Sequence, residues 1–180
     1  MLMLAASVIV VAVIIFLIYN NLVSLRNEIK EAFSAMDIYL KKRWDLAPEL
    51  VATVKAYVVY EQEAFENVVR ARTMNYSDMS MKDKLDADKI MADGVGKLVA
   101  LGESYPKLMA SESFTNLAKE LINLENEISK SRKYYNSRVR LYNAKIEQFP
   151  NTLFAGAMGF DKCEMFAAQD NVRINVRVDG

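Results

Sequence analysis

The first nineteen residues, MLMLAASVIVVAVIIFLIY, carry Ser7 as their one polar side chain, and the first charge along the chain is Arg26. A helix of about 20 residues, rising about 1.5 Å per residue, crosses a hydrocarbon core of about 30 Å. A cleaved secretory signal would add a basic start and a small-residue cleavage site, and the sequence has neither. Residues 1–21 are therefore predicted to be an uncleaved transmembrane anchor. The alternative is a wholly buried core helix.

The basic residues indicate how this anchor is oriented. No Lys or Arg precedes the apolar run, whereas five follow it closely: Arg26, Lys30, Lys41, Lys42 and Arg43. Basic residues beside a span stay on the cytoplasmic side. We expect a single-pass protein with its N-terminus outside and its body in the cytoplasm, and the reverse orientation is the alternative.

Beyond the anchor, the sequence predicts helices. Gly and Pro number only six and three, and apolar residues recur at steps of three and four. We expect the anchor to continue to about Trp44, a second helix to start at Pro48, a third near Lys82 and a fourth near Ser111. The fourth shows heptad-like, coiled-coil spacing up to Phe149. The predicted fold is all-α: a transmembrane helix continuing into an antiparallel up-and-down four-helix bundle over residues 22–149.

Residues 150–166 form an apolar, Gly-containing segment after the fourth helix. An up-and-down bundle returns the end of that helix to the membrane, so this segment is predicted to be membrane-proximal and to make contacts. Glycines allow close backbone approach and the apolar side chains provide contact area. The candidate interaction residues are Phe149, Pro150, Leu153, Phe154, Gly156, Met158, Gly159, Phe160 and Phe166.

The second half of the fourth helix is basic and has no acidic residue between Ile128 and Ile146. Basic residues near an anionic leaflet contribute roughly 1 kcal/mol each. The candidate membrane-facing residues are Lys130, Arg132, Lys133, Arg138, Arg140 and Lys145. The alternative is that they complement the helix dipole and pair with Glu61, Glu63 and Glu66 on a neighbouring helix.

The tail, residues 167–180, alternates apolar and polar residues as a β-strand does. An isolated strand needs an edge for its hydrogen bonds, and other copies of the chain are the simplest source. The candidate oligomerisation strand has Val172, Ile174, Val176 and Val178 on one side. A disordered tail is the alternative.

The sequence offers no catalytic or cofactor site. It lacks His, its lone Cys163 can form no intramolecular disulfide, and its Glu residues accompany no Gly-rich or metal-binding motif. We predict that the protein is not an enzyme and holds no metal or cofactor. The 23 basic and 23 acidic residues cancel, so we expect no nucleic-acid partner.

Within the predicted fourth helix a Tyr-Asn pair occurs twice, at Tyr135-Asn136 and Tyr142-Asn143. The seven-residue spacing puts both pairs on one helix face. They are interpreted as a ladder of hydrogen bonds to Asp37 or Arg43, or to another subunit. The alternative is aromatic core filling with Asn facing solvent.

The segments YNNLVSLRNEIKEAFSAMDIYLKKRWDLAPELVATVKAY and LENEISKSRKYYNSRVRLYNAKIEQFPNTLFAGAMGF resemble the LemA family of bacterial proteins. The resemblance covers about residues 19–166 and leaves the tail outside. It implies a membrane-anchored helical bundle without an assigned catalytic site, and hence the bacterial inner membrane. By position, the recurrent family residues are Arg26, Asn27, Asp37, Arg43, Asp45, Pro48, Lys55, Tyr57, Glu61, Arg132, Tyr135, Asn136, Tyr142, Asn143, Phe149, Pro150, Gly159 and Phe160.

These features favour a structural role. We expect a scaffold that self-associates at the cytoplasmic face, contacts anionic lipids and organises or shapes the membrane. The alternative is a non-enzymatic adaptor that presents its helices to another membrane protein, such as a protease or a sensor kinase.

Overall fold

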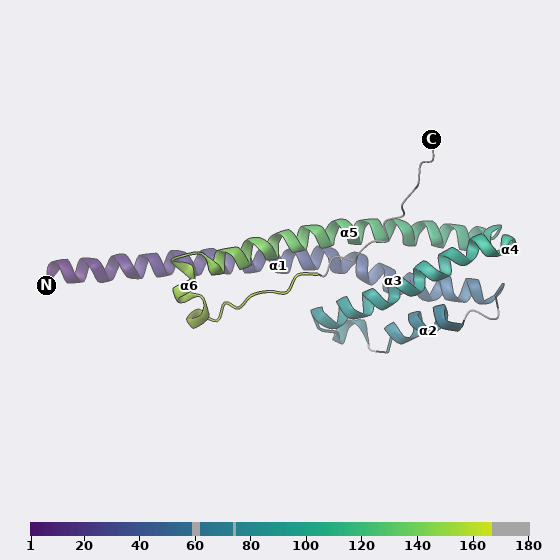
Figure 1. Ribbon diagram of the computed structural model, residues 1–180, viewed down its shortest axis with the longest axis horizontal. Helices are drawn as coiled ribbons and strands as arrows, with labels where there is room; N and C mark the ends of the chain where they lie inside the picture. Colours follow the sequence, from purple (N-terminus) through teal and green to yellow (C-terminus); the bar gives the residue numbers. More distant parts are fainter. Residues whose placement is uncertain (59–61, 74, 167–180) are drawn as a thin grey trace, which may run out of the picture. The chain divides into compact units, whose positions relative to one another are not determined.

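The computed structural model describes residues 1–58, 62–73 and 75–166, and every regular element in these ranges is a helix (Figure 1). The predicted all-α class is thereby confirmed for this part of the chain. The candidate strand residues Val172, Ile174, Val176 and Val178 lie outside it. The elements are α1 (Leu2–Lys55), α2 (Gln62–Ala71), η1 (Tyr76–Asp78), α3 (Met81–Ser104), α4 (Pro106–Met109), α5 (Glu112–Glu147), α6 (Asn151–Phe154) and η2 (Gly156–Met158).

The first helix is longer than predicted, because α1 continues through Pro48 to Lys55. The predicted break between Trp44 and Pro48 is therefore wrong. A proline inside a helix costs about 3 kcal/mol or more. Ala47 and Leu50 flank it and are fully buried, so the inward-facing stripe runs on without interruption. Burying such side chains contributes about 1.5–3 kcal/mol each for the larger ones, which outweighs the lost hydrogen bond.

The chain divides into two compact units that group segments far apart in the sequence. One contains residues 32–131, and the other combines residues 1–31 with the described residues from 132 onward. Helices α1 and α5 each contribute to both units. The predicted domains 1–21, 22–149, 150–166 and 167–180 instead follow the chain in order.

The 32–131 unit has an apolar core contributed by several helices. Helix α2 also contacts α3 through the Asn67 amide, which donates to the Asp93 carboxylate at 3.0 Å. Helix α3 starts where predicted, since Ser80 and Asp83 form a reciprocal capping box. The largest fully buried apolar side chains of the unit are Met36, Leu50, Met91, Leu98, Leu108, Phe114, Leu121 and Ile128.

In the other unit, the start of α1 has the character of a membrane span. It is the one described helix that is long and apolar enough to cross a bilayer, and almost none of its most apolar part is buried within the structure. Its large side chains, such as Phe16 and Leu17, are exposed. An apolar surface of this kind needs lipid or protein to cover it.

Candidate functional site

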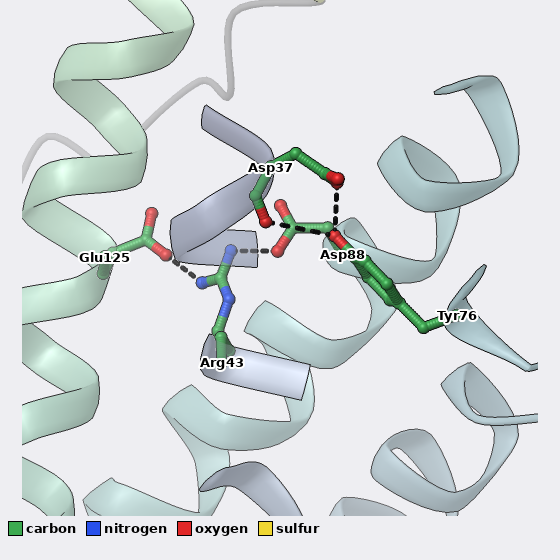
Figure 2. A network of polar contacts seen from close by, with 5 residues as sticks. All are labelled: Asp37, Arg43, Tyr76, Asp88 and Glu125. Atoms are coloured by element: carbon green, nitrogen blue, oxygen red, sulfur yellow. Dashed lines mark hydrogen bonds and ion pairs between the residues drawn. The ribbon is translucent and has the colours of Figure 1, made fainter. Parts of the chain in front are cut away.

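Two clusters of polar side chains stand out, and the first surrounds Arg43 in the 32–131 unit. Arg43 lies on α1 with 1% of its surface exposed, and its two terminal nitrogens pair with Asp88 of α3 and Glu125 of α5 (Figure 2). The planar guanidinium suits this arrangement because it donates in two fixed directions. One side chain therefore joins three helices.

The first cluster has a second part, which surrounds Asp37 in the same unit. Its carboxylate accepts from the Tyr76 hydroxyl at 2.6 Å (Figure 2) and from the Lys84 ammonium at 2.8 Å. The Tyr76 ring packs on Trp44, with 5.3 Å between ring centroids. Burial, and then the bond to Asp37, raise the pKa of Tyr76 above its ordinary value.

These contacts give the cluster a structural role. Its carboxylates are paired with neighbouring cations and with the Tyr76 hydroxyl. Buried networks of this kind fix the register of the helices. Among the residues that the structure describes, no group of three or more His, Cys, Asp and Glu side chains is arranged to hold a metal ion. The expectation that Asp37 or Arg43 would meet the Tyr-Asn repeat is wrong, since both bind the residues named above.

The second cluster, in the other unit, is the Tyr-Asn repeat of α5, which holds an extended part of the same chain. We call Tyr135, Asn136, Tyr142 and Asn143 the clamp, and residues 160–166 the strap. The Asn143 amide donates to the Cys163 carbonyl at 2.8 Å and accepts from the Cys163 N–H at 3.0 Å.

The other clamp residues repeat this pattern along the strap. Asn136 donates to the Phe166 carbonyl at 3.1 Å and accepts from its N–H at 2.8 Å. The hydroxyl groups of Tyr142 and Tyr135 donate to the main-chain carbonyls of Asp161 and Glu164, at 3.1 and 3.3 Å. Every one of these six bonds involves the strap's main chain.

The seven-residue spacing of the clamp has a geometric reason. Seven helical residues rise about 10.5 Å, and three residues of extended chain span about 10 Å. Successive clamp pairs therefore bind strap residues that are three positions apart. Tyr142 and Asn143 bind residues 161 and 163, and Tyr135 and Asn136 bind residues 164 and 166. The predicted ladder exists, but its partner is the chain's own backbone.

Two aromatic side chains hold the ends of the strap. Phe160 is 2% exposed, packs edge-on against Tyr19 of α1 at 5.5 Å, and lies under the Arg26 guanidinium at 5.1 Å. Phe166 packs in the same way against Tyr135 at 5.1 Å, with Arg132 at 5.8 Å from its ring. Each Phe thus contacts both a Tyr ring and an Arg cation, an arrangement that adds to simple burial.

The predicted interaction segment is divided between inward and outward side chains. Phe149, Leu153 and Met165 are 79%, 64% and 51% exposed. Of the other candidate residues, Phe160 is buried, Gly156 and Gly159 are exposed, and Pro150, Phe154, Met158 and Phe166 are half-buried.

The two glycines of this segment are not sites of close packing within the chain. A Cβ added at either would meet nothing within 4 Å. Gly159 instead adopts the left-handed conformation, with φ at +73°, where other residues are strained. It turns the chain from η2 into the strap.

The six candidate basic residues have different surroundings. Lys130 pairs with Glu127 at 2.7 Å, and Arg138 pairs with Glu28 of α1 at 3.0 Å. Neither of these partners is among Glu61, Glu63 and Glu66, and Glu61 lies outside the described residues. Arg132 lies over Phe166, Lys145 is half-buried, and Lys133 and Arg140 are exposed.

The sequence pointed to the Tyr-Asn repeat but not to its occupant. The strap carries no helical or strand periodicity. The two Phe residues at its ends, Phe160 and Phe166, are the signal that could have identified it. Cys163 lies inside the clamp, where burial raises the pKa of its thiol and the nearby Arg26 opposes this shift.

The comparisons with known proteins agree on one family. The family model described as LemA matches residues 32–179, so it starts after the motif at Tyr19 and reaches into the tail, which the sequence resemblance had left outside. The magnetosome protein MamQ 2 of Paramagnetospirillum magneticum is 22% identical over 174 residues, covering 82% of this chain and 64% of that relative. This chain therefore spans slightly less than two thirds of that relative's length.

Two further relatives are similar to this chain. Protein LemA of Metamycoplasma hominis is 24% identical over 164 residues, covering 87% of this chain and 72% of its own length. The magnetosome protein MamQ of Magnetospirillum gryphiswaldense is 28% identical over 85 residues, covering 47% of this chain and 31% of its own length.

Proposed function

Because the chain belongs to the LemA family, a family of membrane-associated proteins, we propose that it is a non-enzymatic, single-pass membrane scaffold. It sits in the inner membrane with its N-terminus outside. Its copies associate at the cytoplasmic face and organise the bilayer there.

One observation carries this proposal: an outward-facing apolar surface lies in the same compact unit as the membrane helix. Phe160 packs on Tyr19, at the end of the apolar run of α1, and this contact anchors the segment that presents Phe149, Leu153 and Met165. Exposed large apolar side chains on a segment that is tied to the end of a span are suited to a lipid surface or a second subunit. We call these three residues the apolar patch.

Basic residues of the same unit support a lipid contact. Lys133 and Arg140 are exposed on the part of α5 that belongs to this unit. Each cation near an anionic leaflet adds about 1 kcal/mol of attraction. We propose that these two bind lipid headgroups, while the ion-paired Lys130 and Arg138 contribute less.

The proposal includes two finer structural features. One is a four-helix bundle of α1, α2, α3 and α5, supported by the Arg43 ion pairs and by the contact between Asn67 and Asp93. The other is a strand formed by the tail of one copy on the tail of another, for which the alternation at residues 172–178 is the support.

Replacing the apolar patch tests self-association. We expect energy transfer between fluorescently labelled copies in cell membranes, and a clear loss of it in the triple variant Phe149→Ser, Leu153→Ser, Met165→Ser. The control replaces Met109 and Ile122, which are 56% and 51% exposed outside the patch, with Ser. Equal energy transfer in the two variants would show that the apolar patch does not lie in the interface. No energy transfer between copies of the wild type would refute self-association.

Orientation is tested by thiol labelling. Glu103 is exposed in the 32–131 unit, so Glu103→Cys in a Cys163→Ser background gives an accessible reporter. We expect an impermeant maleimide to label it in lysed cells but not in intact ones. Labelling of intact cells would reverse the proposed orientation.

The adaptor function has its own supporting observation. Helix α5 carries exposed large apolar side chains away from the apolar patch, at Ile122, Tyr134 and Leu141. Such side chains are suited to packing in a hydrophobic groove of a partner protein. Cross-linking from Leu141→Cys that gives one foreign membrane protein, with no product between copies, would favour the adaptor over the scaffold.

A further inference from the structure

We propose that the clamp is an exchangeable docking site, which takes residues 160–166 either from its own chain or from a second copy of it. This inference rests on the proposed self-association and specifies its mechanism. The copies would be joined by mutual exchange of their straps, an economical route to symmetric dimers.

The clamp recognises features that every copy presents identically. Its six hydrogen bonds involve the strap's main chain, at Asp161, Cys163, Glu164 and Phe166. Main-chain bonds supply the affinity when an extended peptide docks, and side-chain pockets supply the specificity. Nothing in these bonds depends on the occupant belonging to the same chain.

Two aromatic anchors supply specificity for this segment. Phe160 contacts Tyr19 and Arg26, and Phe166 contacts Tyr135 and Arg132. An occupant must therefore be extended and have aromatic residues six positions apart. The strap of a second copy meets both requirements without any change in the clamp.

The chain before the strap is suited to act as a hinge. Asn151 is held to α5, because its side-chain amide donates to the Lys145 carbonyl at 2.8 Å. Between Asn151 and the strap lie the rest of the short α6, the single-turn η2 and the left-handed Gly159.

This hinge is long enough for exchange. At about 3.3–3.6 Å per residue, residues 152–159 reach more than about 25 Å when extended. Neighbouring packed helices lie about 8–10 Å apart. Anchoring in one membrane also raises the effective concentration of neighbouring straps.

Complementation between two defective chains tests the exchange. The first chain has a defective strap, with Phe160→Ser and Phe166→Ser, and keeps its clamp. The second has a defective clamp, with Asn136→Ala and Asn143→Ala, and keeps its strap. Only the clamp of the first chain with the strap of the second can form a complete site.

A cysteine pair reports on the docked strap. Lys162 of the strap forms an ion pair with Glu147 at the end of α5, so these two positions meet when the strap is docked. With Cys163→Ser in both chains, Glu147→Cys is placed in the first chain and Lys162→Cys in the second. The chains carry different tags, are co-expressed in membranes and are treated with a short bismaleimide.

The reverse placement is the control, with Lys162→Cys in the strap-defective chain and Glu147→Cys in the clamp-defective chain. We expect the covalent heterodimer to form at least about tenfold more in the first placement, because the reverse one lacks both the four Asn bonds and the Phe anchors. Equal yields would show proximity without docking and would overturn the exchange.

A second experiment covers the case in which the defective chains fail to accumulate. One otherwise intact chain carries Glu147→Cys and another carries Lys162→Cys, both with Cys163→Ser. Covalent dimers between these chains support exchange, and their absence overturns it when energy transfer between copies is present. Absence of energy transfer itself would instead reject the proposed self-association.

Discussion

At the scale of single residues, Arg43 is the most deeply buried charge among the residues described. Its partners differ in exposure, since the side chain of Asp88 is 5% exposed and that of Glu125 is 41% exposed. Removing one partner of a buried ion pair is costly because the other charge stays buried without compensation. The position therefore contributes much more than an ordinary surface ion pair.

We predict that Arg43→Met lowers the free energy of unfolding by about 3–5 kcal/mol. Lys41→Met is the control, because Lys41 pairs with Asp45 on the exposed side of the same helix and should cost less than about 1 kcal/mol. Urea unfolding of the full chain in micelles, followed by circular dichroism, measures both. Similar losses would mean that the Arg43 pairs do not stabilise the unit.

Tyr76 makes the stability depend on alkaline pH. Burial and the bond to Asp37 raise its folded-state pKa above the unfolded value of about 10. The folded protein then retains a proton that the unfolded chain loses. The stabilisation is present in full below about pH 10 and is lost as the pH rises further.

Tyr76→Phe should reduce this loss above pH 10 by about 1.4 kcal/mol per pH unit. The substitution should also cost about 1.5–3 kcal/mol at neutral pH, because Asp37 loses a hydrogen bond. Tyr57→Phe, at an exposed tyrosine, should leave the free energy of unfolding at neutral pH unchanged. Unfolding titrations from pH 8 to 11 would show the effect, and an unchanged slope in Tyr76→Phe would contradict it.

At the scale of elements, two glycines of α3 make opposite contributions. Gly102 is buried, and a Cβ there would lie 2.7 Å from Cε1 of Phe114. Gly96 is exposed, and a Cβ there would meet nothing within 4 Å. The first glycine is needed for close packing, and the second only weakens the helix.

Gly102→Ala should therefore destabilise the protein by about 1–3 kcal/mol through overpacking. Gly96→Ala should stabilise it by about 0.5–1 kcal/mol through helix propensity. Thermal unfolding of the two variants side by side gives the comparison. Changes of the same sign would show that the Gly102 contact does not control packing here.

The strap is a second element with a direct test. Asn143→Ala removes both bonds to the Cys163 main chain, each contributing about 1 kcal/mol. The population of the open strap should rise at least about tenfold. Opening exposes the Cys163 thiol and relieves the burial that raises its pKa. Alkylation of Cys163 should accelerate accordingly. Asn123→Ala, on an exposed part of α5, should leave the rate unchanged.

How well the elements could be predicted depended on local signals. The start of α3 and the apolar seam of α5 were readable because periodicity and capping residues act within a few positions. The continuation of α1 through Pro48 was not, because the buried stripe that outweighs the proline is a tertiary feature. The strap was missed for a similar reason, since its hydrogen bonds join residues about 20 to 30 positions apart.

At the scale of the whole molecule, the candidate membrane span and the strap belong to one compact unit, and the Arg43 network belongs to the other. The composition of the apolar run identified the candidate span from sequence alone. The grouping of units could not be predicted, because both long helices contribute to each. We expect changes in the clamp or the apolar patch to affect association, and changes near Arg43 to affect stability.

The most direct test of the proposed scaffold is the number of copies in a particle extracted from cell membranes with its native lipid. We would measure the mass of full-length particles released by an amphipathic copolymer without detergent. The proposed scaffold predicts discrete particles of several copies that become smaller when Phe149, Leu153 and Met165 are replaced by Ser. Particles that contain a single copy of the chain would contradict it.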